Sequence, residues 1–272
     1  MIRGFWQSRL AAGGIFAAMA GVAVFVWVRD QGMPVYIPLL ATVLLLALGA
    51  VSGKLAGNIL ANHLNAKCLA LLHIKLDPAA FLAAYEPVPP RLDPASQSYA
   101  VACAYLADGY AAAGEYQKAM AALCPSFAGK KGGEDLSLKG LYYNNLAAYR
   151  LGSEDAAGAA EALGELEKVV EQCRTAKPEF AKNMAANLRF YRNWQACLAG
   201  TKVEGEWLAA ELPKAPYQLR RLELLKVLAL YELKKGRLGR AREHLEALQR
   251  FAGKTCYGPW AEQALAALPP RG

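Results

Sequence analysis

The chain has 272 residues, with 31 Lys and Arg against 23 Asp and Glu, and a net charge of +8. The positive charges are scattered and form no long run, which argues against nucleic acid as a partner. The six cysteines are far apart, with no CxxC pair and no histidine at a metal-ligand spacing. This pattern is typical of buried cysteines on helices, so we expect no disulfide framework, metal or cofactor.

Two long apolar runs near the N-terminus predict a transmembrane helical hairpin. Residues 10–28 and 31–53 are uncharged, and only Arg29 and Asp30 separate them. At 1.5 Å per residue, each run approaches or exceeds the length needed to cross a hydrocarbon core of about 30 Å. The expected organisation is a tail over 1–9, a hairpin over 10–53 with spans 10–28 and 33–53, juxtamembrane helices over 54–90, and a helical-repeat domain over 91–272.

The basic residues that flank the two apolar runs predict an orientation. Arg3 and Arg9 precede the first run, and Lys54, Lys67 and Lys75 follow the second. Because positive flanks stay on the cytoplasmic side, both termini are expected in the cytoplasm of a multi-pass integral membrane protein.

Small residues recur at every fourth position on both predicted spans, at Gly13, Ala17, Gly21, Gly49, Gly53 and Gly57. Such faces let two helices approach closely in lipid. They fit packing of one span on the other, homodimerisation, or simply the high frequency of Gly and Ala in membrane helices. No ionisable side chain interrupts either run, so we expect an anchor in the lipid bilayer and not a transporter.

A helical apolar stripe continues over Lys54–Leu76. Asp77 then stands where a helix N-cap is expected, before a short helix over Pro78–Tyr85 with proline at its first position. Pro87, Pro89 and Pro90 end this helix, and the proline-rich stretch is the expected domain boundary.

A repeated apolar pattern predicts helical hairpins in the rest of the chain. A Leu-Ala pair is followed by Ala at +13 and Leu at +17 in three units, which begin at Leu106, Leu146 and Leu228. The small residues allow two antiparallel helices to approach, and the large ones fill the groove beside them. Glycines at or near the eighth position after the leading leucine are the expected turns, at Gly114, Gly152 and Gly236. A further unit is expected to begin at Leu188, although its second helix lacks the Ala and Leu. One hairpin cannot bury its apolar face, so about four units are expected to stack.

These residues resemble the tetratricopeptide repeat, in the first unit through Leu106-Ala107, Tyr110, Gly114, Tyr116, Ala119 and Leu123, and in the last through Leu228-Ala229, Gly236, Leu238, Ala241 and Leu245. The resemblance covers Pro94 to Phe251. It departs from the family in a spacing of about 40 residues where 34 is usual, in the lack of a consistent proline between units, and in the degenerate third unit.

The resemblance implies an all-α fold, a right-handed α-solenoid of about four helix-turn-helix units closed by a capping helix over Tyr257–Leu268. In this family the inner face of the first helices lines a peptide groove. The candidate groove residues are Asn144, Asn183, Asn187 and Lys226, which would hydrogen-bond a peptide backbone or its end. An ordinary solvated helix surface is the alternative interpretation. Arg189, Arg192, Arg220 and Arg221 are also available, but the pattern does not place them on the groove side.

No phosphate loop, catalytic triad order or zinc-protease motif is present. The leading hypothesis is therefore a membrane-anchored, non-enzymatic scaffold or adaptor that binds a protein or peptide partner. A second hypothesis is a membrane-bound enzyme or enzyme subunit with a site built from His63, Cys68, His73 and Asp77. A third is a self-associating structural membrane module.

Overall fold

The computed structural model describes residues 65–123 and 135–270, together with single positions at 19, 22, 23, 27, 43, 44, 62 and 63. The chain divides into two units, 1–67 and 68–272. The positions described in the first unit are helical. The predicted repeat domain falls within the second unit, which carries the architecture discussed below.

The predicted localisation, an integral membrane protein with two spans, has to be corrected. Among the described residues, no helix combines the length and the apolar character needed to cross a membrane. The predicted spans, 10–28 and 33–53, lie almost entirely outside the described residues, and so do the small-residue positions Gly13, Ala17, Gly21, Gly49, Gly53 and Gly57.

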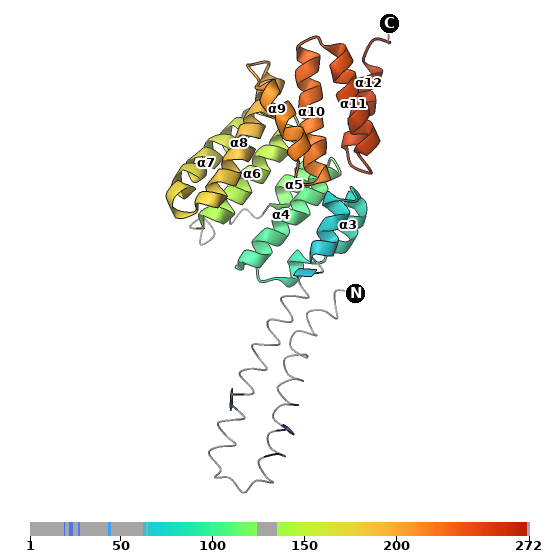
Figure 1. The fold of residues 1–272 in the computed structure, drawn as a ribbon. Coiled ribbons are helices and arrows are strands. Elements are labelled where there is room, and N and C mark those ends of the chain that lie inside the picture. Colours follow the sequence, from blue (N-terminus) through green and yellow to red (C-terminus); the bar gives the residue numbers. More distant parts are fainter. Residues whose placement is uncertain are drawn as a thin grey trace. The chain divides into compact units, whose positions relative to one another are not determined.

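The second unit is all-α over the residues described, which confirms the all-α part of the predicted fold class (Figure 1). A helical segment over 65–73 comes first. The elements that follow are α3 (Pro78–Tyr85), η1 (Pro89–Arg91), α4 (Gln97–Ala112), α5 (Tyr116–Ala122), α6 (Leu136–Gly152), α7 (Ala156–Ala176), α8 (Pro178–Ala199), α9 (Gly205–Glu211), η3 (Leu212–Lys214), α10 (Gln218–Lys234), α11 (Leu238–Phe251) and α12 (Tyr257–Ala266).

Side-chain caps fix where several of these helices begin. The carboxylate of Asp77 accepts a hydrogen bond from the backbone N–H of Ala80 at 3.1 Å, so α3 starts where the sequence predicts. Ser96 caps α4 in the same way, and Asp155 caps α7. These oxygens satisfy N–H groups that the first turn of a helix leaves without an intrahelical partner.

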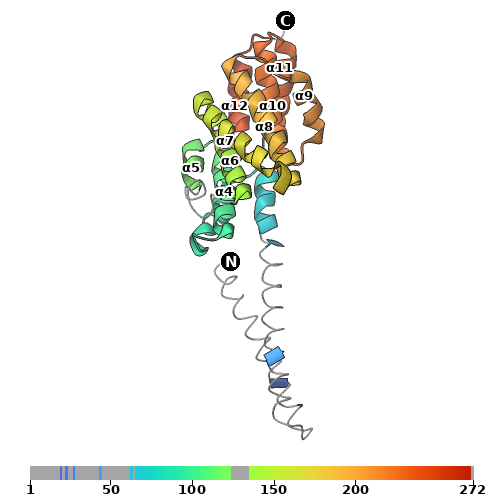
Figure 2. The ribbon, with the colours of Figure 1, turned by 90° about the vertical axis from the view of Figure 1, so that its left-hand side faces the viewer.

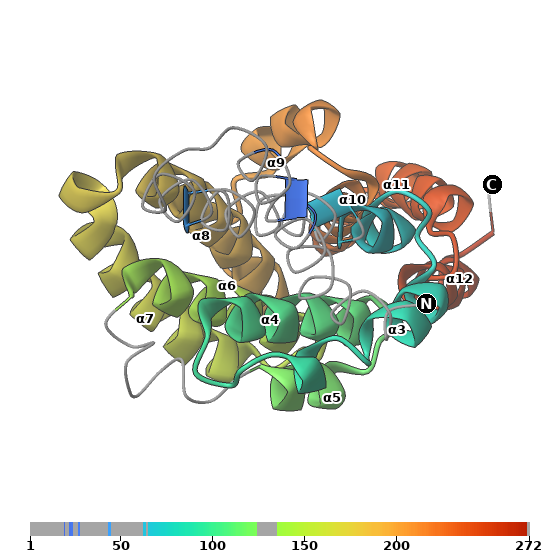
Figure 3. The same cartoon turned by 90° about the horizontal axis from the view of Figure 1, so that it is seen from below.

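Neighbouring helices pack as antiparallel pairs, with α4 against α5, α6 against α7, and α10 against α11. The first helices of successive pairs also touch, so α4 contacts α6, α6 contacts α8, and α8 contacts α10. Figures 2 and 3 show the same unit from two further directions, and in Figure 3 α5 and α7 lie outside α4 and α6. The first helices therefore form the inner layer of this unit.

The residues of the repeated pattern form the seams between paired helices. All six of its alanines are fully buried, at Ala107, Ala119, Ala147, Ala159, Ala229 and Ala241. The leucines four residues after the second alanine of each pair are 3% exposed or less, at Leu123, Leu163 and Leu245. The spacing of small and large residues thus identified the packed seam correctly.

The turns within the pairs use a left-handed residue eight positions after the leading leucine. Gly114 has φ +85°, Gly236 has φ +69°, and Glu154 takes this place in the second pair with φ +63°. The predicted turn glycine of that pair, Gly152, is instead the last residue of α6. An added Cβ at Gly152 would lie 2.3 Å from the Tyr116 ring, so this glycine serves close packing.

The third helical repeat, which begins at Leu188, departs from the pattern. Its first helix, α8, runs past the expected turn and ends at Ala199, before Gly200 with φ +75°. The following helix α9 is short and packs against α10. Its start is held by Asn193, whose side-chain oxygen accepts a 2.7 Å hydrogen bond from the backbone N–H of Glu204. This lengthening explains why Ala and Leu are missing at the usual offsets.

Replacing Gly152 with alanine should destabilise the fold by about 1–2 kcal/mol, because the new methyl group overlaps Tyr116. Gly164, inside α7, is the matched control, since no atom lies within 4 Å of an added Cβ there. Gly164→Ala should stabilise by roughly 0.5–1 kcal/mol through helix propensity. Urea unfolding of the two variants tests this prediction. It requires that the free energy of unfolding falls in Gly152→Ala and rises in Gly164→Ala.

The first and last parts of the second unit are joined. Lys254 donates a 2.9 Å backbone hydrogen bond to the carbonyl of Leu76, and its ammonium pairs with Asp77 at 2.6 Å. The backbone N–H of Cys256 bonds to the carbonyl of Ala112 at 2.9 Å. Because Ala112 ends α4 and Cys256 precedes α12, these contacts link the first pair to the last and enclose the space between the inner helices.

Candidate functional site

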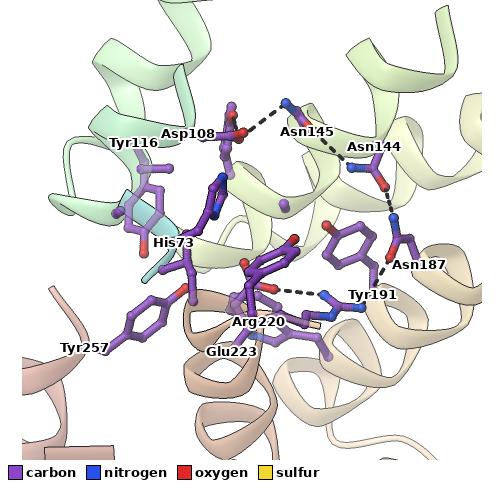
Figure 4. Close-up of a pocket in the computed structure, with 17 residues that line it drawn as sticks. His73, Asp108, Tyr116, Asn144, Asn145, Asn187, Tyr191, Arg220, Glu223 and Tyr257 are labelled. Atoms are coloured by element: carbon purple, nitrogen blue, oxygen red, sulfur yellow. Dashed lines mark hydrogen bonds and ion pairs between the residues drawn. The ribbon is translucent and has the colours of Figure 1, made fainter. Parts of the chain in front are cut away.

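A cavity of about 100 Å³ lies on the inner side of α4, α6, α8 and α10. Each of these helices contributes polar side chains to its lining: Asp108 from α4, Asn144, Asn145 and Tyr149 from α6, Asn187 and Tyr191 from α8, and Arg220 and Glu223 from α10. His73 and Tyr257 complete the wall from the helical segment 65–73 and from α12 (Figure 4).

Three asparagines form a continuous hydrogen-bonded row across this lining, which we call the amide ladder (Asn145, Asn144 and Asn187). Asn187 Nδ2 donates to Asn144 Oδ1 at 3.0 Å, and Asn144 Nδ2 donates to Asn145 Oδ1 at 2.9 Å. Asn145 Nδ2 then donates to Asp108 Oδ1 at 3.3 Å. Figure 4 shows the row running between Asp108 and Arg220.

The ladder is polarised from end to end. At one end the guanidinium of Arg220 donates to Asn187 Oδ1 at 3.4 Å, and at the other the carboxylate of Asp108 accepts. Every amide therefore points its oxygen toward the cation and its nitrogen toward the anion. Hydrogen bonds aligned in this way strengthen one another. Each amide keeps one N–H and one oxygen lone pair that the row does not use.

The two ends of the ladder are held differently. Arg220 lies over the Phe190 ring, 3.6 Å from its centroid, and pairs with Glu223 at 2.8 Å. Burial opposes the charge of Arg220, but Glu223 keeps its pKa above the ordinary value. Asp108 accepts a hydrogen bond from the Tyr149 hydroxyl, and no Lys, Arg or His forms an ion pair with it among the residues described. Burial raises the pKa of Asp108 to about 7, Tyr149 opposes the rise, and Glu223 adds to it.

Two further hollows, both larger, adjoin the central cavity. One of about 170 Å³ shares Asn187, Tyr217 and Arg220 with it. The rest of its lining is mostly apolar, with Trp207 and Leu224 among its residues, and also includes Glu211 and Lys214. Another of about 340 Å³ follows residues 212–218 and also borders Tyr217. Tyr217 is 43% exposed and stands between these spaces. The polar cavity therefore opens beside an apolar surface that has room for more of a ligand.

The structure brings together two of the four predicted groove residues, Asn144 and Asn187. Asn183 lies on the same helix as Asn187 but is exposed and lines no part of the cavity. Lys226 is only 4% exposed, and its ammonium lies over the rings of Trp194, Tyr257 and Trp260. Burial lowers the pKa of Lys226, which belongs to the core behind the lining.

The residues of the alternative enzyme site are not assembled into one place. Asp77 caps α3 and pairs with Lys254, and Cys68 packs against an apolar cluster. His63 belongs to the other unit. Only His73 lines the cavity, with its pKa lowered by burial. Within the described part of the chain, no group of three or more His, Cys, Asp or Glu side chains could hold a metal ion.

Sequence reasoning missed Asp108, Asn145 and Glu223, and it left Arg220 unplaced. A signal for part of the lining was present in the repeat register. Asn145 and Asn187 each precede a leading leucine by one position, and Tyr149 and Tyr191 each follow four residues after the asparagine. Residues four apart share a helix face, so the same Asn-Tyr face recurs in adjacent units.

The chain matches no protein-family model, and comparison with curated proteins and with solved structures gives no match.

Proposed function

We propose that the second unit is a non-enzymatic scaffold or adaptor of the tetratricopeptide-repeat type, which holds a peptide segment of a partner protein against α4, α6, α8 and α10. In this proposal the pairs α4–α5, α6–α7, α8–α9 and α10–α11 are the repeats of a right-handed solenoid, and α12 is its cap. The packed pairs α4–α5, α6–α7 and α10–α11 and the buried seam alanines support this assignment, whereas α9 packs against α10.

The observation that carries the proposal is the amide ladder. Asn144 and Asn145 are 8% and 6% exposed, so their amides are held in fixed positions by the row. A spare N–H and a spare lone pair on each amide match the N–H and C=O of a peptide group. Fixed amides lose little side-chain entropy when they bind, which favours recognition of a backbone.

The adjoining hollows favour a peptide over a small cofactor. A central space of about 100 Å³ is below the usual size of roughly 300–1,000 Å³ for cofactor and drug-sized sites. The apolar space beside Trp207 and Leu224 continues from it, past Tyr217 and Arg220. A bound peptide can place one part in the polar cavity and its neighbouring side chains in the hollow beside Trp207 and Leu224, so that it occupies both spaces.

The test is selection from a random peptide library on the full chain, followed by affinity measurement for the recovered peptides. Asn187→Ala removes the link between Asn144 and Arg220 and should weaken binding at least tenfold, about 1.4 kcal/mol. Asn183→Ala changes the same residue type one turn away, on the exposed surface, and should change affinity less than twofold.

Two results would count against the proposal. Recovery of no peptide above background contradicts peptide binding itself. Equal losses in the Asn187 and Asn183 variants would mean that peptides bind elsewhere on α8.

A further inference from the structure

The charges in the cavity lining leave one carboxylate without a cation. Asp108 and Glu223 are both in the lining, but the guanidinium of Arg220 pairs with Glu223. Asp108 is bonded only to neutral groups among the described residues, the Tyr149 hydroxyl and the Asn145 amide. A carboxylate removed from water without a countercharge is costly for the fold. Because Asp108 lines a cavity, an outside cation has room to compensate the carboxylate when it is ionised.

Aromatic rings line the cavity together with this carboxylate. Tyr116, Tyr191, Tyr217 and Tyr257 line the same cavity, as does Trp194. Ring faces attract cations, and the attraction is strongest where water is excluded. The domain already uses this interaction at Lys226, whose ammonium lies 4.9 Å from the centre of the Trp260 ring. The cavity lining therefore attracts a small cation and repels a second anion.

Two buried polar atoms of lining residues have no hydrogen-bond partner, His73 Nδ1 and Trp194 Nε1. Trp194 is 2% exposed, so its N–H is a buried donor that lacks an acceptor among the described residues. The volume of about 100 Å³ equals roughly three water molecules. The occupant is therefore the end of a side chain or of a chain, with a cation and at least one acceptor close by.

We propose that the cavity binds a primary ammonium group next to Asp108, carried either by a lysine side chain or by the N-terminus of the bound peptide. In both cases a peptide carbonyl follows the ammonium and supplies an acceptor for the unpartnered Trp194 N–H. The inference deepens the proposed peptide binding, and it rests on that function for the source of the ammonium. The enclosing contacts between Cys256 and Ala112 suit a group that enters by its end.

Binding of this cation should depend on pH, because only the ionised form of Asp108 attracts it. The groups that face Asp108 are Tyr105 on its own helix, Tyr149 from α6, Tyr191 from α8, Tyr217, and Glu223 from α10. His73 from the helical segment 65–73 and Arg220 from α10 line the same cavity. The tyrosines are neutral near pH 7, and burial lowers the pKa of His73, so its imidazole is neutral there as well. Asp108 is therefore the group whose charge changes near pH 7. With its pKa at about 7, affinity should be constant at higher pH and fall about tenfold per unit at lower pH.

The experiment titrates the full chain with three small probes, followed through the side-chain amide NMR signals of the ladder. Nα-acetyl-lysine methylamide carries a side-chain ammonium, alanine methylamide carries a terminal ammonium, and Nα-acetyl-norleucine methylamide is the neutral counterpart of the first. At least one amine should bind with a dissociation constant on the order of 1 mM, and the norleucine probe at least tenfold more weakly. The amine that binds tighter identifies the source.

Asp108→Asn should weaken amine binding at least tenfold and abolish its dependence on pH, while Glu161→Gln on the exposed surface of α7 should change neither. Amines that bind no better than the norleucine probe, or equally well to Asp108→Asn, overturn the inference. If peptides bind but neither amine does, the ammonium inference is overturned and the proposed peptide binding stands. Amines that bind while no peptide does would instead contradict the proposed peptide binding.

Discussion

Asp108→Asn should raise the free energy of unfolding at pH 8 by about 2–4 kcal/mol. The pKa of Asp108 is raised from 3.8 to about 7, so the folded protein holds this proton between these values and the unfolded chain does not. Stability is therefore lost as pH rises through this window and stays low above it. Three pKa units correspond to about 4 kcal/mol, and solvent that reaches the cavity lowers the figure.

Asparagine keeps an oxygen that accepts from Tyr149 and Asn145, so the substitution removes the charge and preserves both hydrogen bonds. Urea unfolding from pH 4 to pH 8 should show the two curves converging as pH falls toward 4. Glu161→Gln, which removes an exposed carboxylate from α7, should shift stability by less than about 0.5 kcal/mol at every pH. A stability gain for Asp108→Asn that is the same at pH 4 and pH 8 would contradict the account.

Phe190→Ala should destabilise the fold by about 3–5 kcal/mol. Phe190 is fully buried, packs edge-on against Tyr191 and Trp194, and supports the guanidinium of Arg220 with its ring face. Removing the ring leaves a cavity in the largest core cluster of the domain and frees the cationic end of the ladder. The expected result is a large fall in unfolding free energy, measured by urea denaturation.

Phe251 provides the matched control, because Arg221 also lies over its ring, at 5.1 Å, but Phe251 is 40% exposed. Phe251→Ala should cost less than about 1 kcal/mol. Should Phe190→Ala fail to fold, Phe190→Leu keeps most of the volume and loses the ring, at a cost of about 1–1.5 kcal/mol. In that variant the side-chain amide signal of Asn187 should move, because Arg220 is no longer fixed. An unchanged signal would show that the ring does not position the guanidinium.

The sequence predicted the seams well because they follow from packing alone. Ala119 and Ala241 stand where two helices must approach, and any larger side chain would separate them. The turn of the second pair was predicted less well, since the left-handed residue is Glu154 and Gly152 packs against Tyr116. The extension of α8 to Ala199 could not be predicted, because it depends on contacts of Asn193 with the start of α9.

The site was only partly predictable because its members come from four helices. Asn144 and Asn187 stood out as poor helix formers, whereas Asp108 and Glu223 looked like ordinary charged residues of a solvated helix face. Lys226 was predicted to line the groove, yet the structure buries it among aromatic rings. Only the packing of α4, α6, α8 and α10 shows which of these charges face one another.

The proposal that the amide ladder is a peptide-binding surface is tested most directly by NMR of the full chain with a selected peptide. The largest changes should fall on the side-chain amides of Asn144, Asn145 and Asn187, and the amide of Asn183 should stay unchanged. Changes concentrated on Asn183 and the outer helices α5 and α7, with the ladder signals unmoved, would contradict it.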